Sequence, residues 1–527
     1  MKKIIIFCIS LIILQSSYSG VNVNNGNFHI AYSDFVFGAS GINLPITRTY
    51  NSRSNYVRGY FGVGWSSNLE SYLKFKGKDI VWYQGGGGNV VRFKDKGKYW
   101  LSTLMGSQRI KKDKDLYSLE QSDGSFLMFN KKGQLVKFKD QQGNFVQLVY
   151  KKGLLTQIKD NKNTQTQIKV SEINGFYRVS RLEGGAKVAT FQYDKLGNLI
   201  EARGADSVRY TYSYDKEHNL TKIGYSDGDY KELKYNKEKD WVVYFRDRGG
   251  YVTEYKYFTD KVDPENKFGT ILTSYKQGSK KKVKSRFWYE FKRNEQGKRY
   301  NHRSVTAVDG EVKENIFTEC CGTPLMISTW YDSSIDKKPM FNRKWTRSSG
   351  PKKTTRFQYY ADGLLKSKLS NGGVLTKLKY DKNHRKIASV NRNGKKVSFK
   401  YDSVGNLSRA IDYNTGRDLS VKFNGSGQII TLKEKEFSKS PKNSQLKKTI
   451  YFRYNGSGLP IEIKEVSGKS SGSINIGYHA NGAIKGIFNS KGNAFTSLKE
   501  KESAQRIAMG FQSLLDVVQP RGIGLNP

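Results

Sequence analysis

The sequence predicts an all-β protein: an antiparallel array of β-hairpins, forming an open or partly coiled sheet and followed by a short C-terminal α-helix. The first observation is a Tyr-Asp motif with a fixed period, since Tyr380-Asp381 and Tyr401-Asp402 are 21 residues apart, as are Tyr193-Asp194 and Tyr214-Asp215. Such a period indicates units that bury their apolar faces on one another. The second is composition: 34 Tyr, 28 Phe and 52 Gly against 9 Pro favour short strands joined by glycine turns.

Each repeat unit has the letters of a hairpin. Alternating residues 395–400 lead into Tyr401, and the Asp402 side chain is placed to accept hydrogen bonds from the amides that open a turn. Gly405 suits a positive φ, and Leu407 starts the return strand. As repeated core letters, Tyr and Leu predict ladders on one face, and sugar stacking by the tyrosines is the alternative. The residues that we predict to shape the turns are Tyr193, Asp194, Gly197, Tyr214, Asp215, Tyr380, Asp381, Tyr401, Asp402 and Gly405.

The N-terminus predicts export. Met1-Lys2-Lys3 is followed by an apolar run over 4–14 and by small residues, which is typical of a signal peptide over 1–19 that is cleaved near Ser19-Gly20. The run is short for a membrane span, so an uncleaved anchor is the weaker alternative, and no later stretch predicts a span. We expect the protein in the periplasm, on the outer surface or in the medium.

Residues 20–105 do not follow the repeat. A strand-like segment over 44–52 contains Arg48, Tyr50 and Asn51, and a second segment over 59–66 contains Gly62, Gly64 and Trp65. Glycines two apart beside a Trp predict a tight turn packed under an indole. A phosphate loop would need a following helix, which is not evident.

These two segments, Leu-Pro-Ile-Thr-Arg-Thr-Tyr-Asn-Ser and Gly-Tyr-Phe-Gly-Val-Gly-Trp-Ser, resemble the N-terminal module of RHS/YD-repeat proteins, and the Tyr-Asp units agree with that resemblance. It implies an exported β-rich repeat protein, with a module over 20–105 and a repeat array over 106–500. Toxin-bearing members have an Asp-Pro-Gly junction before a toxin domain. Here Asp263-Pro264 is followed by Glu265 in mid-chain, so self-cleavage and an encoded toxin are not expected.

Two basic stretches, Lys276 to Arg286 and Lys433 to Lys448, interrupt the period and predict solvated hairpin tips or loops. The tail over 501–527 predicts a helix that begins near Ser503 and ends before Pro520. We expect it to cap the last repeat; docking to a partner is the alternative.

The formal net charge is +44, and it falls by two when Lys2 and Lys3 leave with the signal. This favours anionic partners such as envelope polymers or acidic glycans, although lysines spread over strand faces also blunt sheet edges. We expect no specific nucleic-acid binding.

No catalytic, cofactor or metal site is predicted. Cys320 and Cys321 are adjacent, and the five His lack ligand spacing, although His218 falls in a repeat turn. Gly468 to Gly472 matches the letters of a nucleophile elbow, but a strand follows instead of a helix, so a hairpin tip is expected. Asp227 with Asp229, and Asp113 with Asp115, are carboxylate pairs in turn-like segments.

The sequence therefore favours a secreted, non-enzymatic repeat scaffold that binds a cell-surface or envelope ligand, either a glycan or another anionic polymer. The alternative is a shell or chaperone component of a polymorphic-toxin system that encloses a protein cargo encoded elsewhere. An envelope-directed hydrolase is a third hypothesis, which requires a cleft with convergent carboxylates.

Overall fold

The computed structural model describes residues 19–493 except for 40–41, 55–56, 86–89, 103–107, 122–124, 141–142, 162–163, 296, 298, 320–322, 336–351, 362, 371–372, 383–385, 392, 426–427, 456–459, 469 and 479–483. The predicted signal peptide up to residue 18, the Cys320-Cys321 pair and the predicted C-terminal helix lie outside the described residues. No helix in the described part is long and apolar enough to cross a membrane.

A small N-terminal sheet comes first, with strand order β1-β2-β3-β6. Its strands are β1 (Ser19–Asn22), β2 (Asn27–Ala39), β3 (Ile42–Asn51) and β6 (Trp65–Ser67); between the last two come the 3-10 turn η1 (Ser52–Ser54) and the hairpin of β4 (Arg58–Gly59) and β5 (Gly62–Val63). A second 3-10 turn, η2 (Asn68–Glu70), leads into the large sheet.

The large sheet runs from β7 to β42, and each strand pairs antiparallel with the next in chain order. Its first strands are β7 (Tyr72–Lys76), β8 (Asp79–Tyr83), β9 (Val90–Asp95), β10 (Trp100–Ser102), β11 (Arg109–Asp113), β12 (Leu116–Glu120), β13 (Phe126–Asn130), β14 (Leu135–Lys139), β15 (Phe145–Lys151), β16 (Leu154–Asp160), β17 (Gln165–Ile173), β18 (Phe176–Gly184), β19 (Lys187–Tyr193), β20 (Leu199–Arg203), β21 (Arg209–Tyr214), β22 (Leu220–Tyr225), β23 (Tyr230–Tyr235) and β24 (Val242–Arg246). Because the large sheet already begins at Tyr72, the predicted boundary at residue 105 lies within it.

The sheet continues through longer strands and then through the second run of clear repeats. These are β25 (Tyr251–Thr259), β26 (Lys267–Lys276), β27 (Val283–Arg293), β28 (Arg299–Val308), β29 (Glu311–Phe317), β30 (Pro324–Tyr331), β31 (Lys353–Tyr359), β32 (Leu365–Ser370), β33 (Gly373–Tyr380), β34 (Lys386–Asn391), β35 (Lys396–Tyr401), β36 (Leu407–Asp412), β37 (Arg417–Phe423), β38 (Ile429–Glu436), β39 (Gln445–Tyr454), β40 (Pro460–Ser467), β41 (Ser470–Tyr478) and β42 (Ile484–Phe488), with the 3-10 turn η5 (Pro441–Asn443) before β39.

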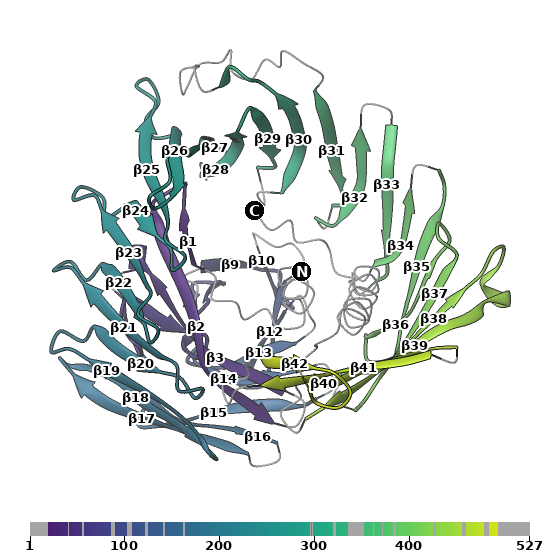
Figure 1. Cartoon of the computed structure of the whole chain (residues 1–527), viewed down its shortest axis with the longest axis horizontal. Coiled ribbons are helices and arrows are strands. Elements are labelled where there is room, and N and C mark those ends of the chain that lie inside the picture. Colours follow the sequence, from purple (N-terminus) through teal and green to yellow (C-terminus); the bar gives the residue numbers. More distant parts are fainter. Residues whose placement is uncertain are drawn as a thin grey trace.

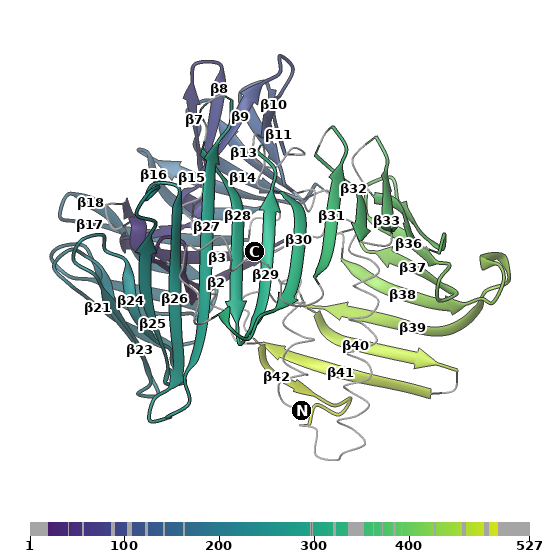
Figure 2. The same ribbon diagram turned by 90° about the horizontal axis from the view of Figure 1, so that it is seen from above.

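The strands follow a curved path around a central space, and the N-terminal sheet lies on its concave side against the early repeats (Figures 1 and 2). The described pairings join β42 to β41 alone, so the sheet is unclosed. The all-β, unclosed hairpin array is the predicted fold class, and it is confirmed. The first strand of the large sheet contacts a later turn of the same sheet: the Leu73 amide donates a hydrogen bond to the Gly133 carbonyl at 2.7 Å.

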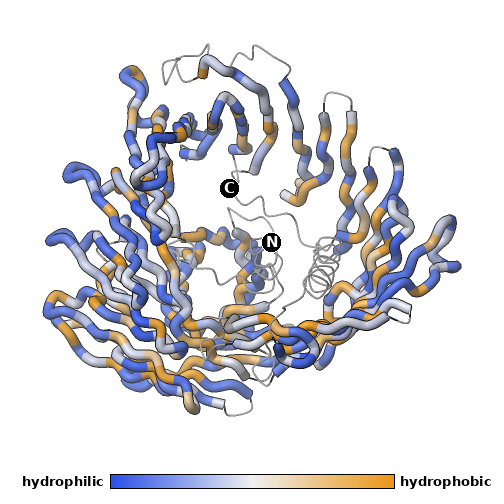
Figure 3. The backbone as a smooth tube through the Cα atoms, in the orientation of Figure 1, coloured by the Kyte–Doolittle hydropathy of each residue, from blue (hydrophilic) through white to orange (hydrophobic). Residues whose placement is uncertain are grey.

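Hydrophobic residues recur along the strands of both runs of repeats, as the hydropathy colours show (Figure 3). A first cluster joins the N-terminal sheet to β7–β25 and includes fully buried Trp65, Tyr50 and Leu220. A second apolar cluster lies on β35–β41: Phe399, Leu407, Ala410, Leu419, Val421, Leu432, Ile450, Phe452, Ile463, Ile474 and Ile476.

Both basic stretches are partly strand. Of Lys276 to Arg286 only residues 277–282 form the predicted hairpin tip, because β26 ends at Lys276 and residues 283–286 belong to β27, which pairs with β26. The prediction for Lys433 to Lys448 is wrong at both ends, because β38 and β39 extend into it and pair with each other, which leaves only 437–444 as the tip. There Lys448 lies 3.6 Å from Glu434 and 3.2 Å from Glu465, so its charge is paired with carboxylates.

Candidate functional site

The Tyr-Asp turns are built by the aspartate. Asp402 Oδ1 accepts hydrogen bonds from the amides of Val404, Gly405 and Asn406 at 3.1, 2.8 and 2.8 Å. Its other oxygen accepts from the Asn406 side-chain amide at 3.1 Å, and the Asp402 amide donates to the Asn406 carbonyl at 2.9 Å. Gly405 has φ +104°, a conformation that glycine adopts without strain because it has no Cβ. One carboxylate therefore accepts from three amides of the turn that would otherwise need other partners.

The upstream turns repeat this geometry. Asp194 accepts from the amides of Leu196 and Asn198, and Asp215 accepts from those of Glu217 and Asn219. His218 occupies the position of the turn glycine with φ +65°, and its Nδ1 lies 2.7 Å from Asn198 Oδ1. His218 therefore lies in a turn, at the position that glycine takes in other units. Asp381 precedes a turn whose residues 383–385 lie outside the described part.

The repeat tyrosines do more than form a ladder. Each hydroxyl donates to the backbone carbonyl at the start of the preceding unit's return strand, 15 residues earlier in the regular units. The pairs are Tyr193 to Val179, Tyr214 to Leu199, Tyr380 to Leu365 and Tyr401 to Lys386, at 2.7, 2.9, 3.1 and 2.8 Å. A register shift just before each Tyr turns the strand there. The tyrosine therefore locks each unit to the one before it.

The N-terminal sheet docks on these units through a buried ion pair. Arg48 Nε lies 2.5 Å from Asp34 Oδ2, Arg48 Nη2 lies 3.0 Å from Asp34 Oδ1, and the same Nη2 donates to Tyr212 Oη at 2.7 Å. The guanidinium is fully buried, with its carbon 4.7 Å from the ring centroids of both Tyr32 and Trp65. Burial opposes its charge, but Asp34 and Tyr212 outweigh that cost, so the pKa of Arg48 is raised.

A β-bulge supplies the partner of Arg48. In the pairing of β2 with β3, Ser33 faces Thr47 and Phe35 faces Ile46, so Asp34 is the extra residue. A bulge re-aims a side chain, which explains how an acidic residue in an apolar strand reaches a buried arginine.

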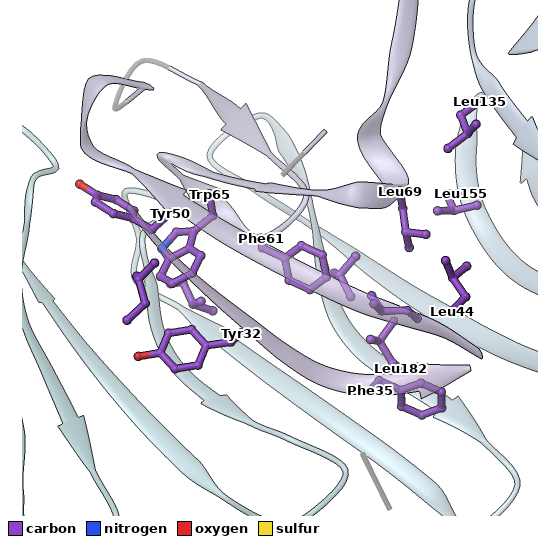
Figure 4. Close-up of a cluster of buried hydrophobic side chains, with 14 of the residues drawn as sticks. Tyr32, Phe35, Leu44, Tyr50, Phe61, Trp65, Leu69, Leu135, Leu155 and Leu182 are labelled. Carbon is purple, nitrogen blue, oxygen red and sulfur yellow. The ribbon is translucent and has the colours of Figure 1, made fainter. Parts of the chain in front are cut away.

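Tyr50 and Trp65, whose rings lie side by side in the N-terminal sheet (Figure 4), form hydrogen bonds with the Tyr-Asp units. The Leu220 amide donates to Tyr50 Oη at 2.9 Å, and Trp65 Nε1 donates to Tyr214 Oη at 2.9 Å. Tyr214 thus accepts from the N-terminal sheet while it donates to Leu199. Tyr214 therefore bonds both to the preceding repeat unit and to the N-terminal sheet.

The glycines allow this close approach. A Cβ on Gly64, at φ +75°, would lie 2.7 Å from Tyr50 Cε2. The predicted packing of the glycine turn under an indole is therefore wrong in one respect: the ring over Gly64 belongs to Tyr50. Gly62 faces the backbone of Gly197, whose carbonyl accepts from the Val63 amide at 3.3 Å. Asn51 closes the turn, since its amide donates to the Gly64 carbonyl at 3.0 Å.

Glu70, at the end of η2, is a half-buried acidic residue of the N-terminal module. Glu70 Oε1 accepts from the Tyr60 amide at 2.8 Å and Oε2 from the Ser67 amide at 2.7 Å. Burial raises the pKa of Glu70 to about 7 against these hydrogen bonds and the nearby Arg178. Arg178, fully buried on β18, donates through Nη1 to the Gly59 carbonyl at 3.0 Å.

The structure brings together the predicted residues of the N-terminal module with Tyr193, Asp194, Gly197, Tyr214 and Asp215 around one junction. Tyr380, Asp381, Tyr401, Asp402 and Gly405 lie in the second run of repeats instead. Sequence reasoning missed Asp34, Tyr212, Arg178 and Glu70. For Asp34 there was a signal, namely an acidic residue inside the apolar run of 28–37.

The weighed catalytic motifs are structural. Ser467 pairs with Ser470 across a β40–β41 hairpin, as expected for Gly468 to Gly472. Asp227 forms an ion pair with Arg248, which also lies 3.5 Å from Asp229. Among the described residues, no group of three or more His, Cys, Asp or Glu side chains is placed to hold a metal ion.

Comparisons with known proteins agree with the two predicted signatures. The family model of a domain of unknown function (DUF6531) matches residues 19–93, and the RHS repeat model matches residues 193–230. A comparison with curated protein sequences gives no significant match. The matches confirm the predicted resemblance to RHS/YD-repeat proteins.

Several solved structures are similar at low identity. The crystal structure of TcdB2-TccC3-Cdc42 gives a TM-score of 0.47 and 11% identity, over 88% of this chain and 24% of that chain. That of TcdB2-TccC3 gives 0.44 and 11%, over 87% and 25%. The Photorhabdus luminescens Tc holotoxin pore gives 0.41 and 10%, over 89% and 26%. The chain thus spans about a quarter of the length of these structures.

Proposed function

We propose that this RHS-repeat protein is a non-enzymatic shell whose concave face holds a protein cargo encoded elsewhere. The observation that carries the proposal is the face to which the N-terminal sheet docks. Tyr212, Tyr214 and Leu220 of that face correspond in the repeat to Phe399, Tyr401 and Leu407. The second apolar cluster is therefore the continuation of a face that, in the early repeats, is covered by another layer of polypeptide.

The side chains of the second apolar cluster are buried, at 0–8% exposed, and in a folded domain such a face packs against a second layer of polypeptide. The described contacts of β35–β41 are with neighbouring strands of the same sheet. The second apolar cluster is thus suited to contact with polypeptide. The hydrolase hypothesis requires several carboxylates in one cleft, whereas the cleft lined by Tyr72 and Phe176 has Glu70 as its one carboxylate.

Site-specific photo-cross-linking tests the proposal. Val397 packs against the second apolar cluster, whereas the adjacent Lys396 is exposed on the opposite face of the same strand. With a photoreactive residue at Val397, we expect the protein from its native host to capture one identified protein in stoichiometric amount. That protein should resist protease in the complex and be degraded alone. Lys396 is the matched control and should capture nothing.

Two results would refute the proposal that this face holds a cargo protein. One is a cross-link from Val397 to residues 494–527 of the same chain, which would make the tail the occupant. The other is equal capture from both positions, which would indicate nonspecific contact.

Binding to an anionic envelope polymer is a second candidate, favoured by the exposed hairpin tip that carries Lys280, Lys281 and Lys282. We expect the chain from Gly20 onwards to be retained on envelope fractions at low salt and released at high salt. Changing these three lysines to Gln should weaken retention. Retention that is unchanged by high salt and by the Lys→Gln substitutions would refute an electrostatic mode of binding.

A further inference from the structure

A cleft of about 650 Å³ opens where the N-terminal module, the start of the large sheet and two hairpin tips meet. Its walls include Tyr72 and Tyr83 on β7 and β8, and Phe176 and Tyr177 at the start of β18. The cleft borders the docked N-terminal module at Asn51, Gly59 and Gly64, but neither Arg48 nor the second apolar cluster lines it. No part of the shell function uses it.

Aromatic rings on one wall form a flat platform. Tyr72 and Tyr83 are direct cross-strand partners, with ring centroids 4.5 Å apart and planes inclined by 3°. Tyr72 remains 44% exposed, although the residues of the first apolar cluster are buried. A stacked pair with an open side is an aromatic surface that the fold itself leaves uncovered.

Two further aromatic side chains, consecutive in the sequence, also line the cleft. Phe176 and Tyr177 are 41% and 45% exposed, although successive strand residues normally point to opposite faces. Phe176 is held by the guanidinium of Arg178, which lies 5.3 Å from its ring centroid, and Arg178 is itself fixed on the Gly59 carbonyl. The Phe176 ring is therefore positioned before any ligand arrives, which lowers the entropic cost of binding.

The remaining lining mixes apolar side chains and glycines with polar groups, which include Asn51, Ser66 and Gln84, and Arg58 is also part of it. Glu70 also borders the cleft, but both of its oxygens accept backbone amides. Aromatic faces attract the positively polarised edges of C–H groups, while amides and hydroxyls exchange hydrogen bonds. A ligand that offers flat C–H faces and many hydroxyls matches both features.

We propose that this cleft binds an oligosaccharide, whose sugar rings stack on Tyr72 and on the Phe176–Tyr177 wall. The inference is independent of the cargo proposal, since it concerns other residues and another ligand class. Binding here would give the shell a contact with glycan that does not depend on its net charge.

Isothermal titration calorimetry of the chain from Gly20 onwards tests this with three tetrasaccharides, of N-acetylglucosamine, β-1,4-linked glucose and α-1,4-linked glucose. We expect at least one to bind, with affinity reduced roughly tenfold or more by Tyr72→Ala and by Tyr177→Ala. Tyr451→Ala is the matched control, because Tyr451 is similarly exposed, at 46%, on distant β39. Binding should resist high salt.

The proposal is overturned if none of the three binds at about 10 mM, a level at which millimolar affinities are measurable. It is also overturned if the alanine variants and the Tyr451 control bind alike. Should Tyr72→Ala disturb folding, seen as a lowered melting temperature, Tyr177→Ala at the hairpin tip decides the question alone.

Discussion

Replacing Arg48 by Met is expected to release the N-terminal sheet from the repeats. Removing one partner of a buried ion pair typically costs about 3–5 kcal/mol, because the other charge stays buried without compensation. Here Asp34 is 3% exposed and would lose both hydrogen bonds from the guanidinium. The contacts of the cation with the rings of Tyr32 and Trp65 add about 0.5–1 kcal/mol each. We therefore expect a loss of about 4 kcal/mol or more.

Native-state hydrogen exchange of β2 and β3 measures this loss locally. A change of about 4 kcal/mol raises the opening constant of these amides roughly a thousandfold. Arg209→Met is the matched control: Arg209 pairs with Glu201 at 2.7 Å but is 50% exposed. Exposed ion pairs contribute about 0–1 kcal/mol, so Arg209→Met should change the hydrogen exchange of β2 and β3 little.

A double variant separates charge from shape. Arg48→Met combined with Asp34→Leu removes both buried charges, and such replacements are often neutral. We expect most of the protection to return. If Arg48→Met exchanges like the Arg209 control, or the double variant is worse than Arg48→Met alone, the ion pair does not hold the sheet as reasoned here.

Three further predictions concern the repeats and Glu70. Tyr401→Phe loses one hydrogen bond and should cost about 1 kcal/mol, whereas Tyr214→Phe also leaves the Trp65 indole without its acceptor and should cost about 1–3 kcal/mol more, by urea unfolding. Gly405→Ala, at φ +104°, should destabilise by about 1 kcal/mol or more in the same assay. Glu70 has a raised pKa of about 7 against an ordinary 4.5, so its ionisation should cost the folded state about 3 kcal/mol as the pH rises through that window. Glu70→Gln should remove this fall in stability.

Each of these has a clear contrary result. Equal losses for the two Tyr→Phe variants would contradict the double use of Tyr214. An unchanged or stabilised Gly405→Ala would mean that the turn relaxes away from its positive φ. For Glu70, the comparison is with Glu201→Gln, a partly exposed carboxylate paired with Arg209, which should keep the pH dependence of the wild type; if both variants keep it, another group titrates.

Local structure was predictable because it depends on short-range chemistry. The aspartate and glycine of each turn lie within five residues of each other, so letters such as Asp402 and Gly405 predict their own geometry. Strand alternation likewise indicated the apolar face. The fold class followed from the repetition of these local rules at a period of 21.

Long-range partners were not predictable, because one sequence carries no record of which distant residues meet. The bond from the Leu220 amide to Tyr50 joins residues 170 positions apart, and the Arg48–Tyr212 bond joins residues 164 apart. The carbonyl that each tyrosine reaches depends on the stagger between units, which the bulges set. The paired charges of Lys448 could not be told from free ones for the same reason.

A density map of the protein purified from the organism that makes it would test the shell function most directly. We predict ordered polypeptide from a second protein over the second apolar cluster, continuing the layer that the N-terminal sheet begins. Density over that face that traces only to this chain, or a bare face in an otherwise ordered shell, would contradict the proposal that the concave side holds cargo.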